Sequence, residues 1–194
     1  MTNPRYAVLL SGSGSTLQNL IDQILHQKLP GQIVGVISSK PGVFGLERAA
    51  RAGLPTAVAK EPFPVLDPWQ PDYVLCAGWL RKLTVPAAYQ GRVLNVHPSL
   101  LPAFGGAGMY GHHVHEAVIA AGCTVSGCTV HFVDDTYDTG PIILQQAVNI
   151  SPSDTPLTLA EKVQAAEREA YPEAIRRVLS GLASDGREPV ASRL

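Results

Sequence analysis

The sequence lacks the features of a membrane protein, of a disulfide-stabilised secreted protein and of a nucleic-acid-binding protein. No apolar run approaches the roughly 20 residues that a membrane-spanning helix needs. The 3 cysteines are odd in number and include no CxxC pair, which disfavours a disulfide framework. Lys and Arg total 15 against 16 Asp and Glu, so there is no basic excess for nucleic acid. We therefore expect neither a membrane nor a nucleic acid as a partner.

Charged residues are also scarce at 16% and aromatic residues at 6%, whereas hydrophobic residues make up 45%. This balance excludes a disordered chain, which needs few apolar residues and much charge. A chain of 194 residues is long enough to bury a substantial core in one domain. The N-terminus has no basic region followed by an apolar stretch of signal length, so we expect a cytoplasmic protein.

Short apolar runs alternate with helical patterns along the first half of the chain. Strands are predicted at residues 6–10, 33–37, 55–59, 73–77 and 93–96, and helices at 17–25 and 47–52. Residues 60–71 hold four prolines, which are expected to block a regular helix. The alternation of strands and helices is typical of a parallel sheet with crossover helices.

The second half of the chain has a different pattern. It predicts a helix at residues 113–121, β-like runs at 124–133 and 142–150, and a helix at 157–182 that Pro172 kinks or splits. The two β-like runs could pair antiparallel at one side of the sheet. The predicted fold is therefore α/β: a mostly parallel, twisted sheet with helices on both faces and an antiparallel edge near the C-terminal half.

A glycine-rich turn, SGSGST at residues 11–16, lies between the first predicted strand and the first helix. Free backbone N–H groups at a helix start suit a phosphate, and Ser15 or Thr16 is expected to cap this helix. The turn lacks the Gly-Lys pair of a nucleotide hydrolase loop. Leu17 also replaces the third glycine of a dinucleotide fingerprint. A small phosphorylated substrate fits best, and a tight turn without a ligand is the alternative.

Two polar residues, Asn95 and His97, follow each other at i and i+2 at the end of a predicted strand. Such side chains point to the same side of a strand, and ligands bind at the carboxyl ends of parallel strands. An amide can stabilise an oxyanion, and an imidazole can move a proton near neutral pH. The sequence therefore indicates a catalytic pair, with a purely structural pair as the alternative.

The loop at residues 134–141 contains three acids, Asp134, Asp135 and Asp138, which composition alone does not rank. A carboxylate beside His97 would raise the pKa of that imidazole and orient it. The alternative is that Asp138 only forms a turn before a glycine. His112, His113 and His115 lack the i, i+4 spacing of helical metal ligands, so no metal site is expected.

Two longer motifs carry a resemblance to a known family. Residues 95–102, NVHPSLLP, resemble the NxHPSLLP motif of folate-dependent formyltransferases, and residues 127–143 resemble their second signature. Residues 11–20, 44–49 and 164–167 are similar to the branch of this family that acts on glycinamide ribonucleotide. The similarity extends over nearly the whole chain.

The resemblance implies that a formyl group passes from 10-formyltetrahydrofolate, a co-substrate, to the amine of glycinamide ribonucleotide in purine synthesis. Asn95 would hydrogen-bond the formyl oxygen, and His97 would be the charged or proton-shuttling partner. Asp138 would hold His97 and an ordered water. No metal is implied, and the chain is expected to be a monomer or a homodimer.

The resemblance also implies two sets of binding residues. The ribonucleotide and its phosphate would contact Gly12, Ser13, Gly14, Ser15, Thr16 and Glu167. The folate would contact Trp79, Leu80, Arg81, Lys82, Leu83, Asn95, Thr136, Tyr137 and Asp138. Trp79 could instead only fill the core. We expect one domain, in which residues 1–90 bind phosphate and substrate, 91–182 hold catalysis and folate, and 183–194 form a tail.

Three other functions remain open at this point. The first is hydrolysis of 10-formyltetrahydrofolate to formate, the second is formyl transfer to another amine, and the third is a binding module without chemistry. The segment at residues 60–71 departs from the family pattern because it is short and holds no arginine. Lys60 could supply a charge there, although lysine is a point donor and arginine a planar fork.

Overall fold

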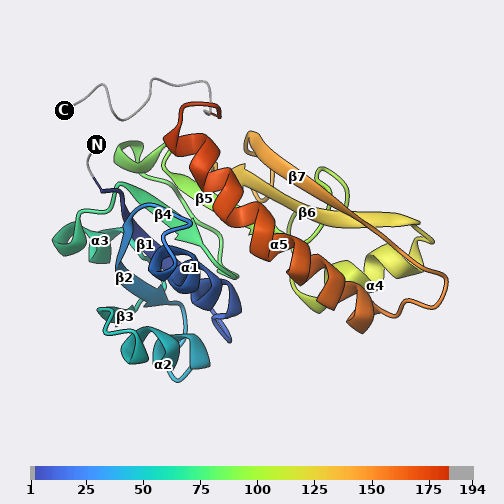
Figure 1. The fold of residues 1–194 in the computed structure, drawn as a ribbon, viewed down its shortest axis with the longest axis horizontal. Coiled ribbons are helices and arrows are strands. Elements are labelled where there is room, and N and C mark those ends of the chain that lie inside the picture. Colours follow the sequence, from blue (N-terminus) through green and yellow to red (C-terminus); the bar gives the residue numbers. More distant parts are fainter. Residues whose placement is uncertain (1–2, 184–194) are drawn as a thin grey trace. The chain divides into compact units, whose positions relative to one another are not determined.

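The computed structural model describes residues 3–183 and contains one seven-stranded sheet, in the order β3-β2-β1-β4-β5-β6-β7 (Figure 1). The neighbours β1–β2, β1–β4, β2–β3 and β4–β5 run parallel, whereas β6–β7 is antiparallel. The predicted α/β class, with a mostly parallel sheet and an antiparallel edge, is confirmed.

The helices and strands have the following bounds. The strands are β1 (Arg5–Leu10), β2 (Gln32–Ser38), β3 (Thr56–Val58), β4 (Tyr73–Cys76), β5 (Val93–His97), β6 (Val125–Phe132) and β7 (Ile142–Asn149). The helices are α1 (Ser15–Leu25), α2 (Phe44–Arg51), α3 (Phe63–Leu66), α4 (His112–Ala120) and α5 (Pro156–Leu179), with 3-10 turns η1 (Asp67–Trp69) and η2 (Ala87–Tyr89). The chain divides into two compact units after Asn95. The predicted tail lies, apart from Ala183, outside the described residues.

The first unit is built around β1, which pairs with β2 on one side and with β4 on the other. The run from Tyr6 to Leu10 is fully buried, as expected for a central strand of a parallel sheet. Leu17 and Leu20 of α1 are also fully buried, but Leu25 is 71% exposed. The apolar face predicted for α1 is therefore shorter than expected, because the last turn of the helix faces solvent.

The proline-rich segment at residues 60–71 is more ordered than the sequence predicts. It contains the single helical turn α3 and then η1. Pro62 is the N-cap of α3 and Pro64 lies in its first turn, where the missing N–H needs no partner. The expectation that prolines block any regular helix is thus wrong for this one turn.

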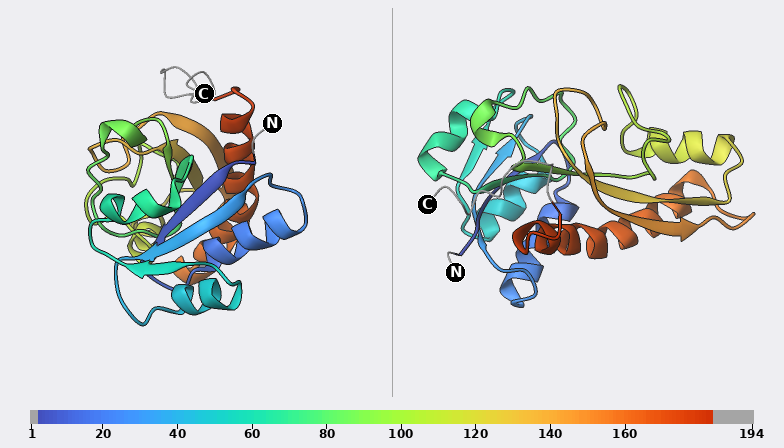
Figure 2. Two further views of the ribbon diagram at one scale, coloured as in Figure 1. Left: turned by 90° about the vertical axis from the view of Figure 1, so that its left-hand side faces the viewer. Right: turned by 90° about the horizontal axis from the view of Figure 1, so that it is seen from above.

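The second unit packs the long helix α5 against β6, β7 and α4 (Figures 1 and 2). Its buried residues recur at three- and four-residue spacing, as predicted: Leu159, Val163, Ala166 and Ala170. The helix continues through Pro172, which is buried beside Tyr171, so of the two predicted alternatives, a kink or a split, the split is wrong. Packing of the buried face holds the helix together despite the lost hydrogen bond.

None of the helices within residues 3–183 is long and apolar enough to cross a lipid bilayer. Cys76, Cys123 and Cys128 are free thiols. Burial raises the pKa values of Cys76 and Cys128 to about 12, so neither is a reactive thiolate near neutral pH.

Candidate active site

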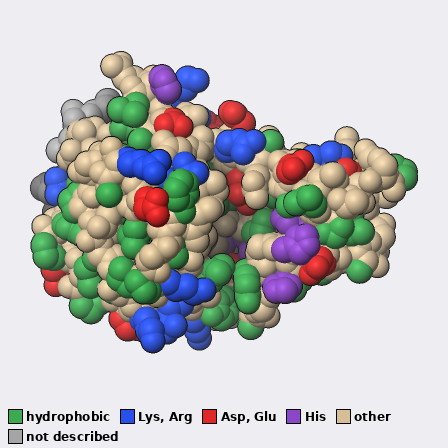
Figure 3. Space-filling view, turned by 90° about the horizontal axis from the view of Figure 1, so that it is seen from below, with side chains coloured by type: hydrophobic (Ala, Val, Ile, Leu, Met, Phe, Trp, Pro, Cys, Tyr) green, Lys and Arg blue, Asp and Glu red, His purple; other side chains and the backbone are tan. Residues whose placement is uncertain are grey.

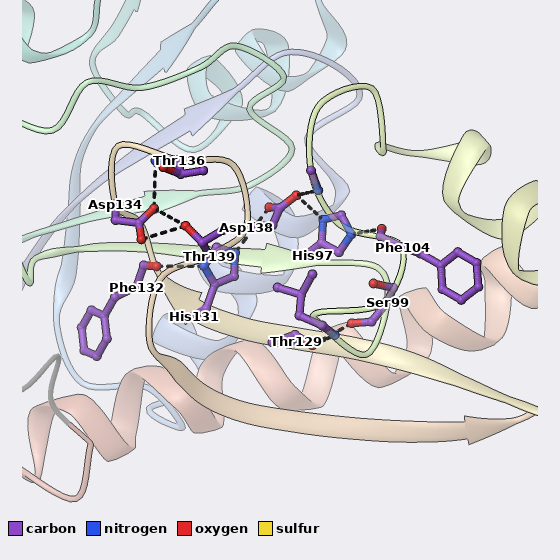
Figure 4. Close-up of polar contacts among 12 residues, drawn as sticks. His97, Ser99, Phe104, Thr129, His131, Phe132, Asp134, Thr136, Asp138 and Thr139 are labelled. Carbon is purple, nitrogen blue, oxygen red and sulfur yellow. Dashed lines mark hydrogen bonds and ion pairs between the residues drawn. The ribbon is translucent and has the colours of Figure 1, made fainter.

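In the second unit, a carboxylate lies between two imidazoles (Figure 4). The Oδ2 atom of Asp138 lies 3.5 Å from Nδ1 of His97, and its Oδ1 atom lies 3.6 Å from Nε2 of His131. The backbone N–H of Gly106 donates to Oδ2 at 2.9 Å. Both histidines are at most 4% exposed. The structure thus brings the predicted His97 and Asp138 together and adds His131.

The ends of two strands place the histidines, because His97 is the last residue of β5 and His131 lies near the end of β6. Two residues before His131, and so on the same side of β6, the hydroxyl of Thr129 donates to the carbonyl of Ser99 at 2.7 Å. The same hydroxyl accepts from the N–H of Leu101 at 3.0 Å. Thr129 therefore ties the segment that follows His97 to β6.

The three acids of the 134–141 loop have different environments. Asp134 closes its own loop, because Oδ1 accepts the N–H of Thr136 at 3.0 Å and Oδ2 accepts the hydroxyl of Thr139 at 2.9 Å. Asp135 is exposed. Asp138 has a φ of 57°, the left-handed conformation that aspartate adopts more readily than most residues. The backbone conformation of Asp138 and its contacts with the two histidines distinguish it from Asp134 and Asp135, and composition carries no such signal.

Burial and nearby charge shift the pKa values of this cluster in opposite directions. Burial lowers the pKa of His97 below its ordinary value, more than Asp138 and the Phe104 carbonyl raise it. The predicted effect of the carboxylate is confirmed, because Asp138 raises the pKa of His97, but desolvation of the buried imidazolium outweighs it. Burial raises the pKa of Asp138, but the hydrogen bond from His131, the charge of His97 and the Gly106 N–H together bring it below its usual range.

A third buried histidine lies in the same unit. His115 of α4 is 4% exposed, and its Nδ1 has no hydrogen-bond partner within residues 3–183. Burial lowers the pKa of His115, with smaller contributions from His112 and His97. His112 and His113 are exposed, and each lies 3.4 Å from Glu116. Figure 3 shows histidine side chains at the surface of the molecule. Within residues 3–183, no group of three or more potential ligands could hold a metal ion.

In the first unit, the glycine turn leads into α1 through Gly14. Gly14 is the N-cap, with a φ of 73°, and no side chain caps the helix. The prediction that Ser15 or Thr16 caps α1 is wrong, because Ser15 is already the first helical residue. A Cβ atom at Gly14 would lie 2.6 Å from Cα of Gly45, so the turn needs glycine there. The N–H groups of the first turn of α1 thus receive no side-chain cap.

An arginine that the sequence did not single out braces this turn. Arg48 of α2 donates from Nε to the carbonyl oxygen of Ser13 at 3.0 Å and from Nη1 to Oε1 of Gln18 at 3.2 Å. Its guanidinium also lies 4.7 Å from the centre of the Phe44 ring. Arg48 is one of the residues in the segment 44–49 that resembles the family, but its contact with the turn follows only from the fold.

The segment predicted to bind folate is partly buried and partly exposed. Trp79 and Leu83 are buried, whereas Leu80, Arg81 and Lys82 are exposed. The indole Nε1 of Trp79 has no hydrogen-bond partner within residues 3–183. Burial of the Trp79 ring is compatible with core packing. A residue that only fills the core does not need a buried N–H without a partner, so the indole N–H is available to a ligand.

The remaining predicted residues have distinct environments. Asn95 is half-buried on β5, and Thr136 and Tyr137 are exposed in the 134–141 loop. Glu167 lies on α5, where burial raises its pKa to about 7. A carboxyl group with such a pKa changes its charge within the physiological range.

Comparisons with known proteins agree on one family. A protein-family model described as formyl transferase matches residues 4–175 of this chain. The chain is 44% identical over 191 residues to the trifunctional purine biosynthetic protein adenosine-3 of Bos taurus, with 91% of this chain and 18% of that protein covered. It is 38% identical over 186 residues to the chloroplastic phosphoribosylglycinamide formyltransferase of Arabidopsis thaliana, with 88% and 64% covered. The chain spans less than two thirds of either relative.

Solved structures of similar size also match. Glycinamide ribonucleotide transformylase 1 from Symbiobacterium toebii superposes with a TM-score of 0.85 at 38% identity, covering 92% of this chain and 89% of that one. The phosphoribosylglycinamide formyltransferase from Coxiella burnetii, solved in complex with CHES, has a TM-score of 0.85 at 34% identity, covering 97% and 92%. The fold thus agrees with these structures over nearly their full length.

Proposed function

This chain belongs to the formyl transferase family, and on that basis we propose that it transfers the formyl group of 10-formyltetrahydrofolate to the amine of glycinamide ribonucleotide. The observation that carries the proposal is the Asp138 carboxylate, held beside His97 two residues after Asn95. The relatives named for this reaction support the choice of acceptor.

The reaction forms a carbon–nitrogen bond to the amine and breaks the one to the donor nitrogen. One proton leaves the attacking amine, and one arrives on the departing nitrogen. The protein must therefore stabilise a negative oxygen and exchange one proton. Asn95, His97 and Asp138 are the groups in this chain that suit these tasks.

Asn95 stabilises the formyl oxygen. Its side-chain amide donates a hydrogen bond to that oxygen as negative charge develops on it. A fixed amide dipole in a half-buried position costs no reorganisation at that moment. An oxyanion donor acts on the transition state, so its effect falls on kcat.

Asp138 accepts the amine proton directly or through one water. Its pKa lies below the usual range, so it is ionised at neutral pH and available as an acceptor. His97 faces the same carboxylate and shares the proton with it. The two groups titrate together, so the proton belongs to the pair.

The co-substrate 10-formyltetrahydrofolate supplies an activated formyl group. Its pteridine needs apolar walls and a few polar groups, and the segment at residues 79–83 offers both. Leu83 and the Trp79 ring supply apolar surface, and the indole N–H of Trp79 is a buried donor without a partner within residues 3–183. The residues at 79–83 therefore fit 10-formyltetrahydrofolate.

The acceptor is held by its phosphate and its ribose. The N–H groups at the start of α1, which no side chain caps, bind the phosphate together with the hydroxyls of Ser13 and Ser15. Glu167 accepts hydrogen bonds from the ribose hydroxyls when it is ionised. A hydrolase would need no such phosphate site.

A spectrophotometric assay with a stable deaza analogue of 10-formyltetrahydrofolate tests this function. Release of deformylated folate should require glycinamide ribonucleotide. Equal release without the ribonucleotide would establish a hydrolase, and release only with another amine would change the acceptor. A reaction without the enzyme gives the background rate, and sedimentation of the protein sample would test the predicted monomer or homodimer.

A further inference from the structure

A side chain of the outermost strand β7 is bonded to the segment that follows His97. Gln145 lies directly opposite Thr129 of β6. Its Nε2 donates to the carbonyl oxygen of Leu101 at 2.9 Å and to the hydroxyl of Thr129 at 2.9 Å. The N–H of Leu101 donates to the same hydroxyl at 3.0 Å. These three hydrogen bonds close a ring through Gln145, Thr129 and Leu101, which we call the Gln145 clamp.

The hydrogen-bonding capacities of these groups fix the orientation of the Gln145 amide. The Thr129 hydroxyl donates its one hydrogen to the carbonyl of Ser99 at 2.7 Å, so it accepts from its other two partners. The carbonyl oxygen of Leu101 can only accept. The NH2 group of Gln145, and not its carbonyl group, must therefore face Leu101. Both hydrogens of this NH2 group are used in the clamp.

The clamped segment returns to the His97 ring. The hydroxyl of Ser99 donates to the carbonyl oxygen of Ala103 at 2.6 Å, which closes a turn after the strand. The next residue, Phe104, places its carbonyl oxygen 2.9 Å from Nε2 of His97 (Figure 4). The orientation of the His97 ring therefore depends on a turn that Gln145 ties to β6 and β7.

The same segment also faces Asp138. Leu101 is 5% exposed, and its Cδ2 would lie 2.5 Å from a Cβ added at Gly105. That added Cβ would lie 3.3 Å from Cβ of Asp138, so Gly105 fills the space between the two side chains. The next N–H, that of Gly106, donates to Oδ2 of Asp138 at 2.9 Å. A displacement of Leu101 would therefore move the backbone that contacts the carboxylate.

We propose that Gln145 is a positioning residue for the transfer reaction. Its amide holds the 99–106 segment in the place from which this segment orients His97 and Asp138. Gln145 bonds to the segment and not to the reacting groups, so its effect passes through the clamp. The catalytic meaning of this role rests on the proposed function, whereas the hold of Gln145 on the segment does not.

The kinetic test uses Gln145→Met, which removes both donors and keeps a side chain of similar length. Gln145 is exposed on the outermost strand, so the variant should fold, and circular dichroism establishes this. Its kcat should fall by roughly 10–10²-fold, because a displacement of about 1 Å at the reacting groups can cost that much. KM for either substrate should change little, because the proposed binding segments are not displaced.

Gln32→Met is the matched control. It makes the same chemical change at an exposed strand position. Gln32 is the first residue of β2, at the end of the strand away from the carboxyl edge where ligands bind. This variant should keep the kcat of the wild type.

Gln145→Glu separates the shape of the side chain from its hydrogen bonds. Glutamate has the shape of glutamine, but an ionised carboxylate has no hydrogen to donate and would face the carbonyl oxygen of Leu101. Its kcat should therefore fall at least as far as that of Gln145→Met. Wild-type kcat in either variant would overturn the proposal. A merely structural role would lower the free energy of unfolding and leave kcat of the folded protein unchanged, which would also refute it.

Hydrogen exchange of backbone amides, followed by NMR, measures the hold on the segment without substrate. In Gln145→Met the N–H groups of Leu101 and Gly106 should exchange roughly tenfold faster than in the wild type, because the clamp loses two hydrogen bonds. Unchanged exchange at Gly106 beside a lower kcat would refute an action through the 99–106 segment. Faster exchange in a protein without transferase activity would support the clamp and refute only the proposed function.

Discussion

The hydroxyl group of Ser11 accepts a hydrogen bond from the backbone N–H of Leu80 at 3.1 Å, and it shares a second hydrogen bond with the hydroxyl of Ser39 at 2.7 Å. Ser11 is the first residue of the glycine turn, and Leu80 belongs to the segment proposed to bind folate. One buried hydroxyl thus joins the two proposed binding segments of the first unit.

Replacing Ser11 with alanine should weaken this connection. Ser11→Ala leaves the Leu80 N–H without its acceptor, which should lower the free energy of unfolding by about 1–3 kcal/mol. The KM for the folate donor should also rise, because the 79–83 segment loses its anchor. Urea unfolding and steady-state kinetics measure both effects. Ser153→Ala, at an exposed position, is the control, and equal effects in the two variants would contradict the connection.

The turn before α1 should tolerate no side chain at Gly14. Gly14→Ala would place a side chain on a left-handed backbone and in contact with Gly45. We therefore expect the free energy of unfolding to fall by roughly 1–3 kcal/mol. The KM for glycinamide ribonucleotide should also rise. Gly53→Ala is the matched control, since Gly53 has a φ of 69° but no atom within 4 Å of its added Cβ. It should show only the backbone cost, and an equal loss in both variants would exclude the Gly45 contact.

Loss of the Asn95 amide should slow turnover. Asn95→Ala should lower kcat by roughly 10²–10³, the typical loss for one oxyanion donor, while KM changes little. Steady-state kinetics with both substrates measure the two constants. Asn149→Ala, on the exposed side of β7, should behave as wild type. Wild-type turnover of the Asn95 variant would remove this residue from the mechanism.

Removing the Asp138 charge should change the pH dependence of kcat. Asp138 raises the pKa of His97, so Asp138→Asn should move the titration of His97 to lower pH and slow the reaction. The pH profile of kcat from about pH 5 to pH 9 measures the shift across the unperturbed His range. Asp135→Asn is the exposed control from the same loop. An unshifted profile would mean that Asp138 does not act on the histidine.

Glu167 should make stability depend on pH. Burial raises its pKa from 4.5 in the unfolded chain to about 7 in the folded protein, so folding binds a proton between these values. The contribution of Glu167 to the free energy of unfolding therefore falls as pH rises through this range. The free energy of unfolding of Glu167→Gln should exceed that of wild type by on the order of 1–3 kcal/mol at pH 8, and by less at pH 5. Urea unfolding at both pH values, with Glu169→Gln as the exposed control, tests this. A pH-independent difference would contradict the prediction.

The parallel part of the fold could be predicted from the sequence because β1 to β5 are short, mostly apolar runs with glycine or proline close to their ends. The errors are local and come from packing or from backbone geometry. Pro172 does not split α5 because its neighbours are buried, and hydrophobic spacing alone does not weigh this against a lost hydrogen bond. Gly14 replaces Ser15 as the N-cap of α1, since the approach of Gly45 decides which residue can stand there.

The candidate site could be predicted only in part. Asn95 and His97 follow from their spacing on one strand, and the family resemblance singles out Asp138 among three acids. His131 was missed, although it lies at i+2 from Thr129 in a strand that ends beside the same loop. The spacing of Thr129 and His131 at i and i+2 on one strand is the same pattern that predicts Asn95 and His97. The contact of His131 with Asp138, however, depends on the left-handed turn at Asp138.

The division of the chain after Asn95 also bears on how such a protein can evolve. The glycine turn and the 79–83 segment are encoded before this point, whereas His97, His131 and Asp138 are all encoded after it. Recombination at β5 would therefore exchange the two proposed binding segments and leave the proton-handling groups intact. A lineage can in this way inherit the acid–base chemistry unchanged while its phosphate- and donor-binding segments diverge.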